Sequence, residues 1–96
     1  MRIDYSKIPA ATMDDLTAWV KTARPLGGFL SAVVNNNLAE AFMRADDANQ
    51  RAMFHIMGYL YNKAPIGSWA YPEATKRWPQ ILIEAGHPGR KEKPPL

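Results

Sequence analysis

The sequence predicts an all-α protein: a small helical bundle built on a central antiparallel helix hairpin, with a broken C-terminal helix and a flexible tail. Apolar residues recur at helical spacing, as in Leu16, Trp19, Val20 and Ala23. No stretch alternates apolar and polar residues as a half-buried strand would. With 96 residues, 47% of them hydrophobic and 22% charged, the chain has the composition of one folded domain. We place a single helical domain at residues 1–86 and a flexible basic tail at residues 87–96.

The first helix is expected to begin at Thr12 and to end near Ala23. Thr12 is a good N-cap because Asp14 and Asp15 follow it in the first turn, where the helix dipole favours negative charge. The helix should end before Pro25, since the residue preceding a proline is disfavoured in helical conformation.

The hairpin is expected to consist of helices over residues 28–45 and 46–63. Asp46 or Asp47 caps the second helix, and Pro65 stops it. Because almost nothing separates the two helices, they should pack antiparallel.

The C-terminal helix is expected to be broken. Pro72 suits the first position of a helix, and Pro79 then interrupts it. The pattern predicts one short helix before Trp78 and a second from Pro79 to Ala85, capped by Gly86.

Charge and composition narrow the class of protein. The net charge is +3, but Arg90, Lys91 and Lys93 belong to the tail, so the body of the domain is nearly neutral. A duplex-DNA binder usually concentrates its basic residues on one face, so we do not expect nucleic acid as the partner. There are no cysteines, which removes disulfides and thiolate chemistry and fits a reducing compartment. Neither a signal peptide nor an apolar run long enough to span a membrane is visible, so we expect a cytoplasmic protein without a membrane partner.

No catalytic or metal-binding signature stands out. His55, expected on the polar side of its helix, and His87 in the tail both lack a second ligand four residues away. Helix capping accounts for the paired aspartates, and no serine lies in a nucleophile-elbow sequence. We therefore expect no enzyme activity, no cofactor and no metal.

The asparagines are the unusual feature of the chain. Residues 35–37 are all asparagine, a poor helix former, inside a stretch that otherwise predicts a helix. Asn37 and Asn49 fall on the apolar stripes of two neighbouring helices, whereas Asn35 and Asn36 should be more exposed. Asn37 and Asn49 either bond each other or cap the hairpin with Asp46, or they form the polar floor of a pocket or an oligomer interface.

Trp69 and Tyr71 lie in a predicted loop. One interpretation is that they fold back to close the core above Trp78. The other is that they form a stacking or protein-contact surface, because aromatic faces bind nucleobases and are frequent at protein interfaces.

Part of the chain resembles a group of small, mostly uncharacterised phage and prophage accessory proteins. The resemblance covers roughly residues 3–78 and is carried by Ile8-Pro9, the run PLGGFLSAVVNNNL at 25–38, Ala45-Asp46, Asn49, Tyr59-Leu60-Tyr61-Asn62 and Trp69. It implies a protein that acts inside a bacterial cell. Small phage proteins without catalytic groups often act in counter-defence by stoichiometric binding, so the resemblance implies that setting here.

Three functions are compatible with these features. The first is a non-enzymatic counter-defence protein, a homo-oligomer that sequesters a small nucleotide immune signal between subunits. Its pocket would be lined by Asn36, Asn37, Asn49, Trp69 and Tyr71, with Arg44 or Arg51 neutralising phosphate. The second is an anti-CRISPR-like, protein-binding inhibitor of a bacterial immune complex or another host machine, acting through Trp69, Tyr71 and exposed helix faces. The third is a nucleic-acid-associated phage factor that uses the tail with Lys76 and Arg77.

Overall fold

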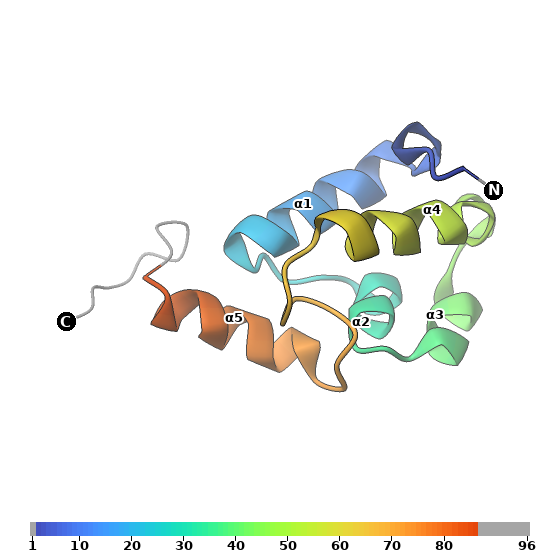
Figure 1. Ribbon diagram of the computed structural model, residues 1–96. Helices are drawn as coiled ribbons and strands as arrows, with labels where there is room; N and C mark the ends of the chain where they lie inside the picture. Colours follow the sequence, from blue (N-terminus) through green and yellow to red (C-terminus); the bar gives the residue numbers. More distant parts are fainter. Residues whose placement is uncertain (1, 87–96) are drawn as a thin grey trace.

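The computed structural model describes residues 2–86, and within them the chain is all-helical (Figure 1). The elements are η1 (Tyr5–Lys7), α1 (Ala10–Thr22), α2 (Gly28–Val34), α3 (Leu38–Arg44), α4 (Asp47–Lys63) and α5 (Ala74–Glu84). This confirms the predicted all-α class and the small helical bundle. The expected tail at residues 87–96 lies outside the described residues. No helix in residues 2–86 has both the length and the apolar character needed to cross a membrane.

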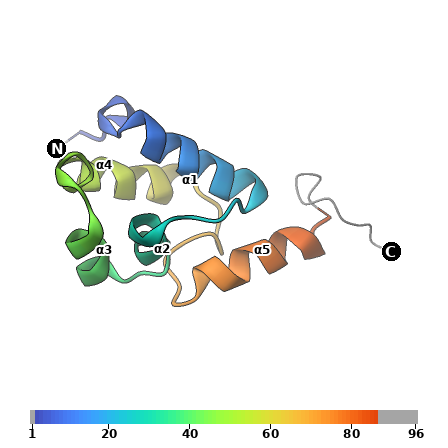
Figure 2. The ribbon, with the colours of Figure 1, turned by 180° about the vertical axis from the view of Figure 1, so that it is seen from behind.

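Helices α1 and α4 lie side by side and run in the same direction, while α2, α3 and α5 lie across from them (Figures 1 and 2). Near the start of this pair the Thr12 hydroxyl donates to Asn49 Oδ1 at 2.8 Å. Near its end the Trp19 indole N–H donates to the carbonyl of Ser68 at 2.9 Å. Thr12 is therefore not the N-cap that was expected: α1 begins at Ala10, and Thr12 is a buried residue of its first turn.

Two clusters of buried side chains form the core. The first comprises Ile8, Leu16, Leu30, Ala32, Val33, Ala41, Ala52, Met53, Ile56 and Leu60. The second comprises Trp19, Ala23, Val34, Ala74, Trp78 and Leu82. Both α1 and α2 contribute residues to both clusters, so these two helices join the two parts of the core.

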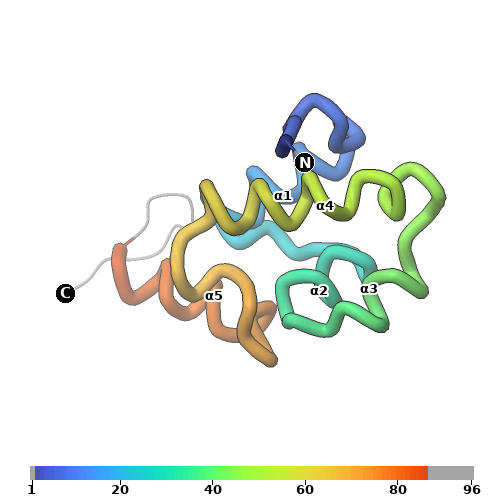
Figure 3. Tube along the Cα trace, turned by 45° about the vertical axis from the view of Figure 1, so that its right-hand side comes forward, coloured from blue at the N-terminus to red at the C-terminus, as the bar shows by residue number. Residues whose placement is uncertain are grey.

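The prediction of one helix over residues 28–45 is wrong. Figure 3 shows the chain turning between α2 and α3, and Asn36 has a left-handed backbone with φ of 65°. Asn37 then caps α3, since its side chain accepts from the N–H of Glu40 at 3.3 Å. A left-handed residue cannot continue a right-handed helix, and asparagine tolerates this conformation better than most residues. The first helix of the expected hairpin is therefore replaced by the two short helices α2 and α3. The long neighbour of α4 is α1 instead, and it runs parallel to α4.

The bounds predicted for α4 are confirmed. Asp46 is the N-cap, its side chain accepting from the N–H of Asn49 at 2.8 Å. The helix ends at Lys63, and Ala64 before Pro65 is already extended.

The expected break in the C-terminal helix is wrong, because α5 continues through Pro79. It begins at Ala74 rather than at Pro72. The indole N–H of Trp78, adjacent to the proline, donates to the carbonyl of Trp19 at 2.9 Å and to that of Val20 at 3.2 Å. Packing of this buried side chain against the end of α1 keeps α5 helical despite its proline.

Candidate functional site

Three of the expected ligand-binding residues lie on α3 or just before it. Asn36 and Asn37 are exposed, and both shape the turn into α3. Arg44 is exposed in the last turn of α3 and forms an ion pair with Glu40, one turn earlier. Its guanidinium is therefore already engaged by a carboxylate.

Asn49 and Arg51 lie in the first turns of α4 and have different environments. Asn49 is half-buried and accepts the Thr12 hydrogen bond. Of the alternatives for Asn37 and Asn49, the structure does not show a bond between them: Asn37 caps α3, and Asn49 bonds Thr12 through its side chain and Asp46 through its N–H. Arg51 is exposed.

Trp69 and Tyr71 lie in the loop between α4 and α5. Trp69 is partly buried and packs against both core clusters, which supports the interpretation that it folds back over the core. Tyr71 is 39% exposed, and the guanidinium carbon of Arg77 lies 5.5 Å from its ring centroid. This cation–π contact covers one face of the tyrosine.

The structure does not assemble these residues into one site. Within residues 2–86, no hydrogen bond or ion pair joins any two of the seven residues expected to bind ligand. Only Arg51 among them lines the surface depression described next.

An open depression of about 620 Å³ lies between the η1–α1 segment and the start of α4. We call it the η1–α4 depression, and it is lined by Ser6, Lys7, Ile8, Pro9, Ala10, Ala48, Arg51 and Ala52. Its two charged side chains, Lys7 and Arg51, are both cationic and exposed, and neither takes part in the ion pairs found within residues 2–86. Pro9, the N-cap of α1, makes no side-chain capping bond, so the positive end of the helix dipole adds to the same potential.

The wall that carries Lys7 is held against α4 by polar and aromatic contacts. The N–H of Asp4 donates to His55 Nδ1 at 2.9 Å, and the rings of Tyr5 and Tyr59 meet edge to face with centroids 5.8 Å apart. His55 is buried, so the expectation that it lies on the polar side of its helix is wrong. Gly58, one turn after His55, lies on the same face of α4. A Cβ there would come within 2.5 Å of Ile3, so the absence of a side chain allows the N-terminal segment to pack closely.

Asp4 has the clearest electrostatic perturbation among the described residues. The Ser6 hydroxyl donates to its carboxylate at 2.6 Å and the Ser6 N–H at 3.0 Å. These bonds, the hydroxyl's first, hold the pKa of Asp4 below its ordinary value. Asp4 therefore fixes the turn of η1 and stays ionised, and the nearby charge of Lys7 also helps to lower its pKa.

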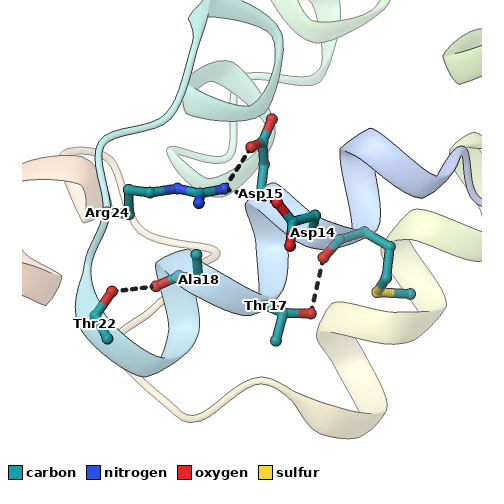
Figure 4. Close-up of polar contacts among 7 residues, drawn as sticks. Asp14, Asp15, Thr17, Ala18, Thr22 and Arg24 are labelled. Atoms are coloured by element: carbon teal, nitrogen blue, oxygen red, sulfur yellow. Dashed lines mark hydrogen bonds and ion pairs between the residues drawn. The ribbon is translucent and has the colours of Figure 1, made fainter. Parts of the chain in front are cut away.

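The aspartates of α1 have a structural role that differs from the expected one. Because the helix begins at Ala10, Asp14 and Asp15 lie beyond its first turn. Both pair with Arg24, at 3.4 and 2.7 Å, as Figure 4 shows. Nearby, the hydroxyls of Thr17 and Thr22 donate to carbonyls one turn earlier on the helix (Figure 4). Both carboxylates on this polar face of α1 are therefore paired with Arg24.

Asn35 is a residue whose role the sequence did not reveal. Its Oδ1 accepts from the N–H of Thr75 at 2.9 Å, and its Nδ2 donates to the Thr75 hydroxyl at 3.1 Å. The N-cap of α5, Glu73, makes no side-chain capping bond, so Asn35 supplies the cap from another helix. No local pattern could indicate a partner 40 residues away.

Within residues 2–86 no group of three or more histidine and carboxylate side chains lies close enough to hold a metal ion. Comparison with known proteins adds no further assignment: no family model matches the chain, and neither the curated proteins nor the solved structures contain a significant match.

Proposed function

We propose that this protein is a non-enzymatic, phage-type accessory protein that binds a small phosphate-bearing ligand stoichiometrically, in the manner of a counter-defence protein that sequesters a nucleotide signal. The observation that carries the ligand class is the η1–α4 depression, where Lys7 and Arg51 line one open volume and neither forms an ion pair within residues 2–86. The phage setting rests on the sequence resemblance alone.

The size and charge of the depression favour this ligand class. A volume of about 620 Å³ falls in the range of small-molecule sites. Lysine and arginine form charge-assisted hydrogen bonds with phosphate oxygens, and the positive end of α1 strengthens them. The apolar surfaces of Ile8 and Pro9 complete the lining and can contact a base or ribose.

The test is native mass spectrometry of the full chain with mononucleotides, cyclic mono- and dinucleotides, and inorganic pyrophosphate. We expect one of these probes to be retained, and Lys7→Gln and Arg51→Gln to weaken its binding roughly tenfold each. Lys76→Gln, an exposed cation on α5, is the matched control and should bind as the wild type does. Retention that is indifferent to both substitutions, or no retention of any probe, would contradict the proposal.

The two other functions receive less support from the geometry. The protein-binding inhibitor was expected to use Trp69, Tyr71 and exposed helix faces, and the two aromatic residues are already engaged: Trp69 packs against the core and Arg77 lies over Tyr71. The nucleic-acid alternative depends on the tail, which lies outside the described residues, and on Arg77, which is engaged by the same ring.

A further inference from the structure

His55 is the only buried residue with an ionisable side chain within residues 2–86. It is 8% exposed, and its Nδ1 accepts the backbone N–H of Asp4 at 2.9 Å. Nδ1 therefore carries no proton, and the proton of the neutral ring lies on Nε2. This hydrogen bond joins the N-cap residue of η1 to the middle of α4.

The hydrogen bond exists only with the neutral form of His55. A protonated imidazole carries a hydrogen on each nitrogen, so Nδ1 then has no lone pair to accept the Asp4 N–H. Protonation therefore exchanges a hydrogen bond for a repulsive contact between two donors. Histidine is the side chain that ordinarily changes charge between about pH 5 and 8.

Two segments contribute the ionisable groups around this contact: Arg2, Asp4, Tyr5 and Lys7 before and within η1, and Arg51 and Tyr59 on α4. The carboxylates of α1 do not add to them, because Asp14 and Asp15 are paired with Arg24. The carboxylate nearest in sequence to the contact is therefore that of Asp4 itself. The pKa of Asp4 is lowered first by the Ser6 hydroxyl, and the charges of Lys7 and His55 lower it further.

Asp4 does not offer a replacement for the lost bond without a change in η1. Its Oδ1 accepts from the Ser6 hydroxyl at 2.6 Å and from the Ser6 N–H at 3.0 Å, and these bonds cap η1. A turn of the carboxylate toward a protonated His55 would pull on both Ser6 bonds, and the Asp4 N–H would still lack an acceptor. Protonation of His55 therefore disturbs η1 whether or not the carboxylate moves.

The two partners of this bond are close in sequence to the cations of the η1–α4 depression. Lys7 lies three residues after Asp4, and Arg51 lies one turn before His55 on the same face of α4. Ser6, which bonds Asp4, also lines the depression.

We propose that protonation of His55 loosens η1 from α4 and thereby lowers the affinity of the η1–α4 depression for a phosphate-bearing ligand. The effect on the ligand rests on the proposed function, whereas the loosening of η1 does not. Other contacts of the segment remain: Tyr5 meets Tyr59, the Asn62 amide donates to the Tyr5 hydroxyl at 3.3 Å, and Ile3 packs over Gly58. The loss of one hydrogen bond should therefore weaken the docking of η1 roughly tenfold and leave the segment attached.

NMR measurement of the exchange of the Asp4 amide with water, on the full chain from about pH 8 to about pH 5, tests the proposal without a ligand. Protection is expressed relative to an unstructured chain at the same pH. We expect it to fall roughly tenfold in the wild type on acidification. In His55→Asn it should change by less than about twofold, because the asparagine Oδ1 lies as many bonds from Cα as Nδ1 does and carries no titrating proton.

His87→Asn is the matched control, since it removes the only other histidine of the chain, and it should behave as the wild type does. Constant protection of the Asp4 amide in the wild type, or an equal fall in His55→Asn, would overturn the proposal.

A second measurement on the wild type does not depend on the folding of a variant. The chemical shift of the Asp4 amide proton and those of the His55 ring protons should follow one common midpoint. An Asp4 amide that responds only to its own carboxylate, below about pH 4, would also overturn the proposal.

The effect on the ligand is measured by isothermal titration calorimetry with cyclic mono- and dinucleotides and inorganic pyrophosphate. Comparing the wild type with His55→Asn at each pH cancels any titration of the probe. The affinity of the wild type should fall roughly tenfold more than that of the variant between about pH 8 and 5. Equal changes in both proteins would overturn the link between His55 and the depression. Failure to bind any probe at either pH would contradict the proposed function, while the Asp4 amide would still decide whether His55 controls η1.

Discussion

Three consecutive asparagines illustrate how much one side chain can determine in this molecule. Asn35 caps α5 through Thr75, Asn36 adopts the left-handed turn, and Asn37 caps α3. Each uses a property that makes asparagine a poor residue inside a helix: its short amide bonds the backbone, and it tolerates positive φ. The run therefore ends one helix, begins a second and caps a third.

Replacing Asn35 with alanine should destabilise the protein by about 1–2 kcal/mol, because both bonds to Thr75 are lost and the N-terminus of α5 is left uncapped. Urea denaturation measures the change. Asn36→Gly is the matched control, since glycine adopts positive φ readily, and it should cost no more than a few tenths of a kcal/mol. If the glycine variant were the less stable of the two, the assignment of Asn35 as a cap would be wrong.

The Asp4–Ser6 turn should make stability depend on pH. Because the pKa of Asp4 is lowered in the folded state, its contribution is present above the pKa of the unfolded chain and is lost as pH falls through the folded pKa. Ser6→Ala should therefore be less stable than the wild type at pH 6, and the difference should shrink as pH falls below about 4. Thermal unfolding at a series of pH values measures this, and a difference that grows on acidification would contradict it.

At the scale of elements, helix bounds are predictable from the sequence where the interactions that set them are local. The bounds of α4 were predicted because its N-cap, Asp46, and its stop, Pro65, are adjacent to it in the chain. The continuity of α5 was not predicted. Pro79 is a local signal for a break, whereas the hydrogen bond of Trp78 that holds the helix is made to α1, distant in the sequence. The proposed site follows the same rule: the sequence offered Arg51 as a candidate phosphate ligand, but it did not single out Lys7, which lines the same depression only once η1 lies against α4.

The proline in α5 is a local defect that packing overcomes, so removing it should help. Pro79→Ala restores a backbone N–H that can donate to the carbonyl of Thr75, and we expect a gain of about 1–3 kcal/mol in unfolding free energy. Pro72→Ala, which lies before the helix, should give no comparable gain. Thermal or urea unfolding of both variants checks this, and a loss of stability in Pro79→Ala would show that the proline ring itself is needed.

At the scale of the whole molecule, the two core clusters depend on each other. Leu16 and Trp19 lie one turn apart on α1 but belong to different clusters, and adjacent Val33 and Val34 divide in the same way. Neither cluster can lose its part of α1 without disturbing the other. We therefore expect one cooperative unfolding transition.

Trp78→Phe tests this cooperativity. It removes the indole N–H that caps the end of α1 and should destabilise the protein by about 1–3 kcal/mol. Helix content by circular dichroism and the fluorescence of the remaining tryptophans should still report a single shared midpoint. Two separate midpoints would show that the clusters unfold independently.

Gly58 lies outside the η1–α4 depression, but its lack of a side chain lets Ile3 pack closely against α4. A methyl group added there would have to move Ile3, because nearly all of that side chain lies within 3 Å of the new atom. Ile3 lies just before η1, so its displacement should also move Lys7, and Gly58→Ala should alter the affinity of the η1–α4 depression for pyrophosphate although position 58 does not line it. Isothermal titration calorimetry of this variant and the wild type would measure whether a shift at Ile3 is transmitted to Lys7. An unchanged affinity would show that the chain between Ile3 and Lys7 accommodates the methyl group locally.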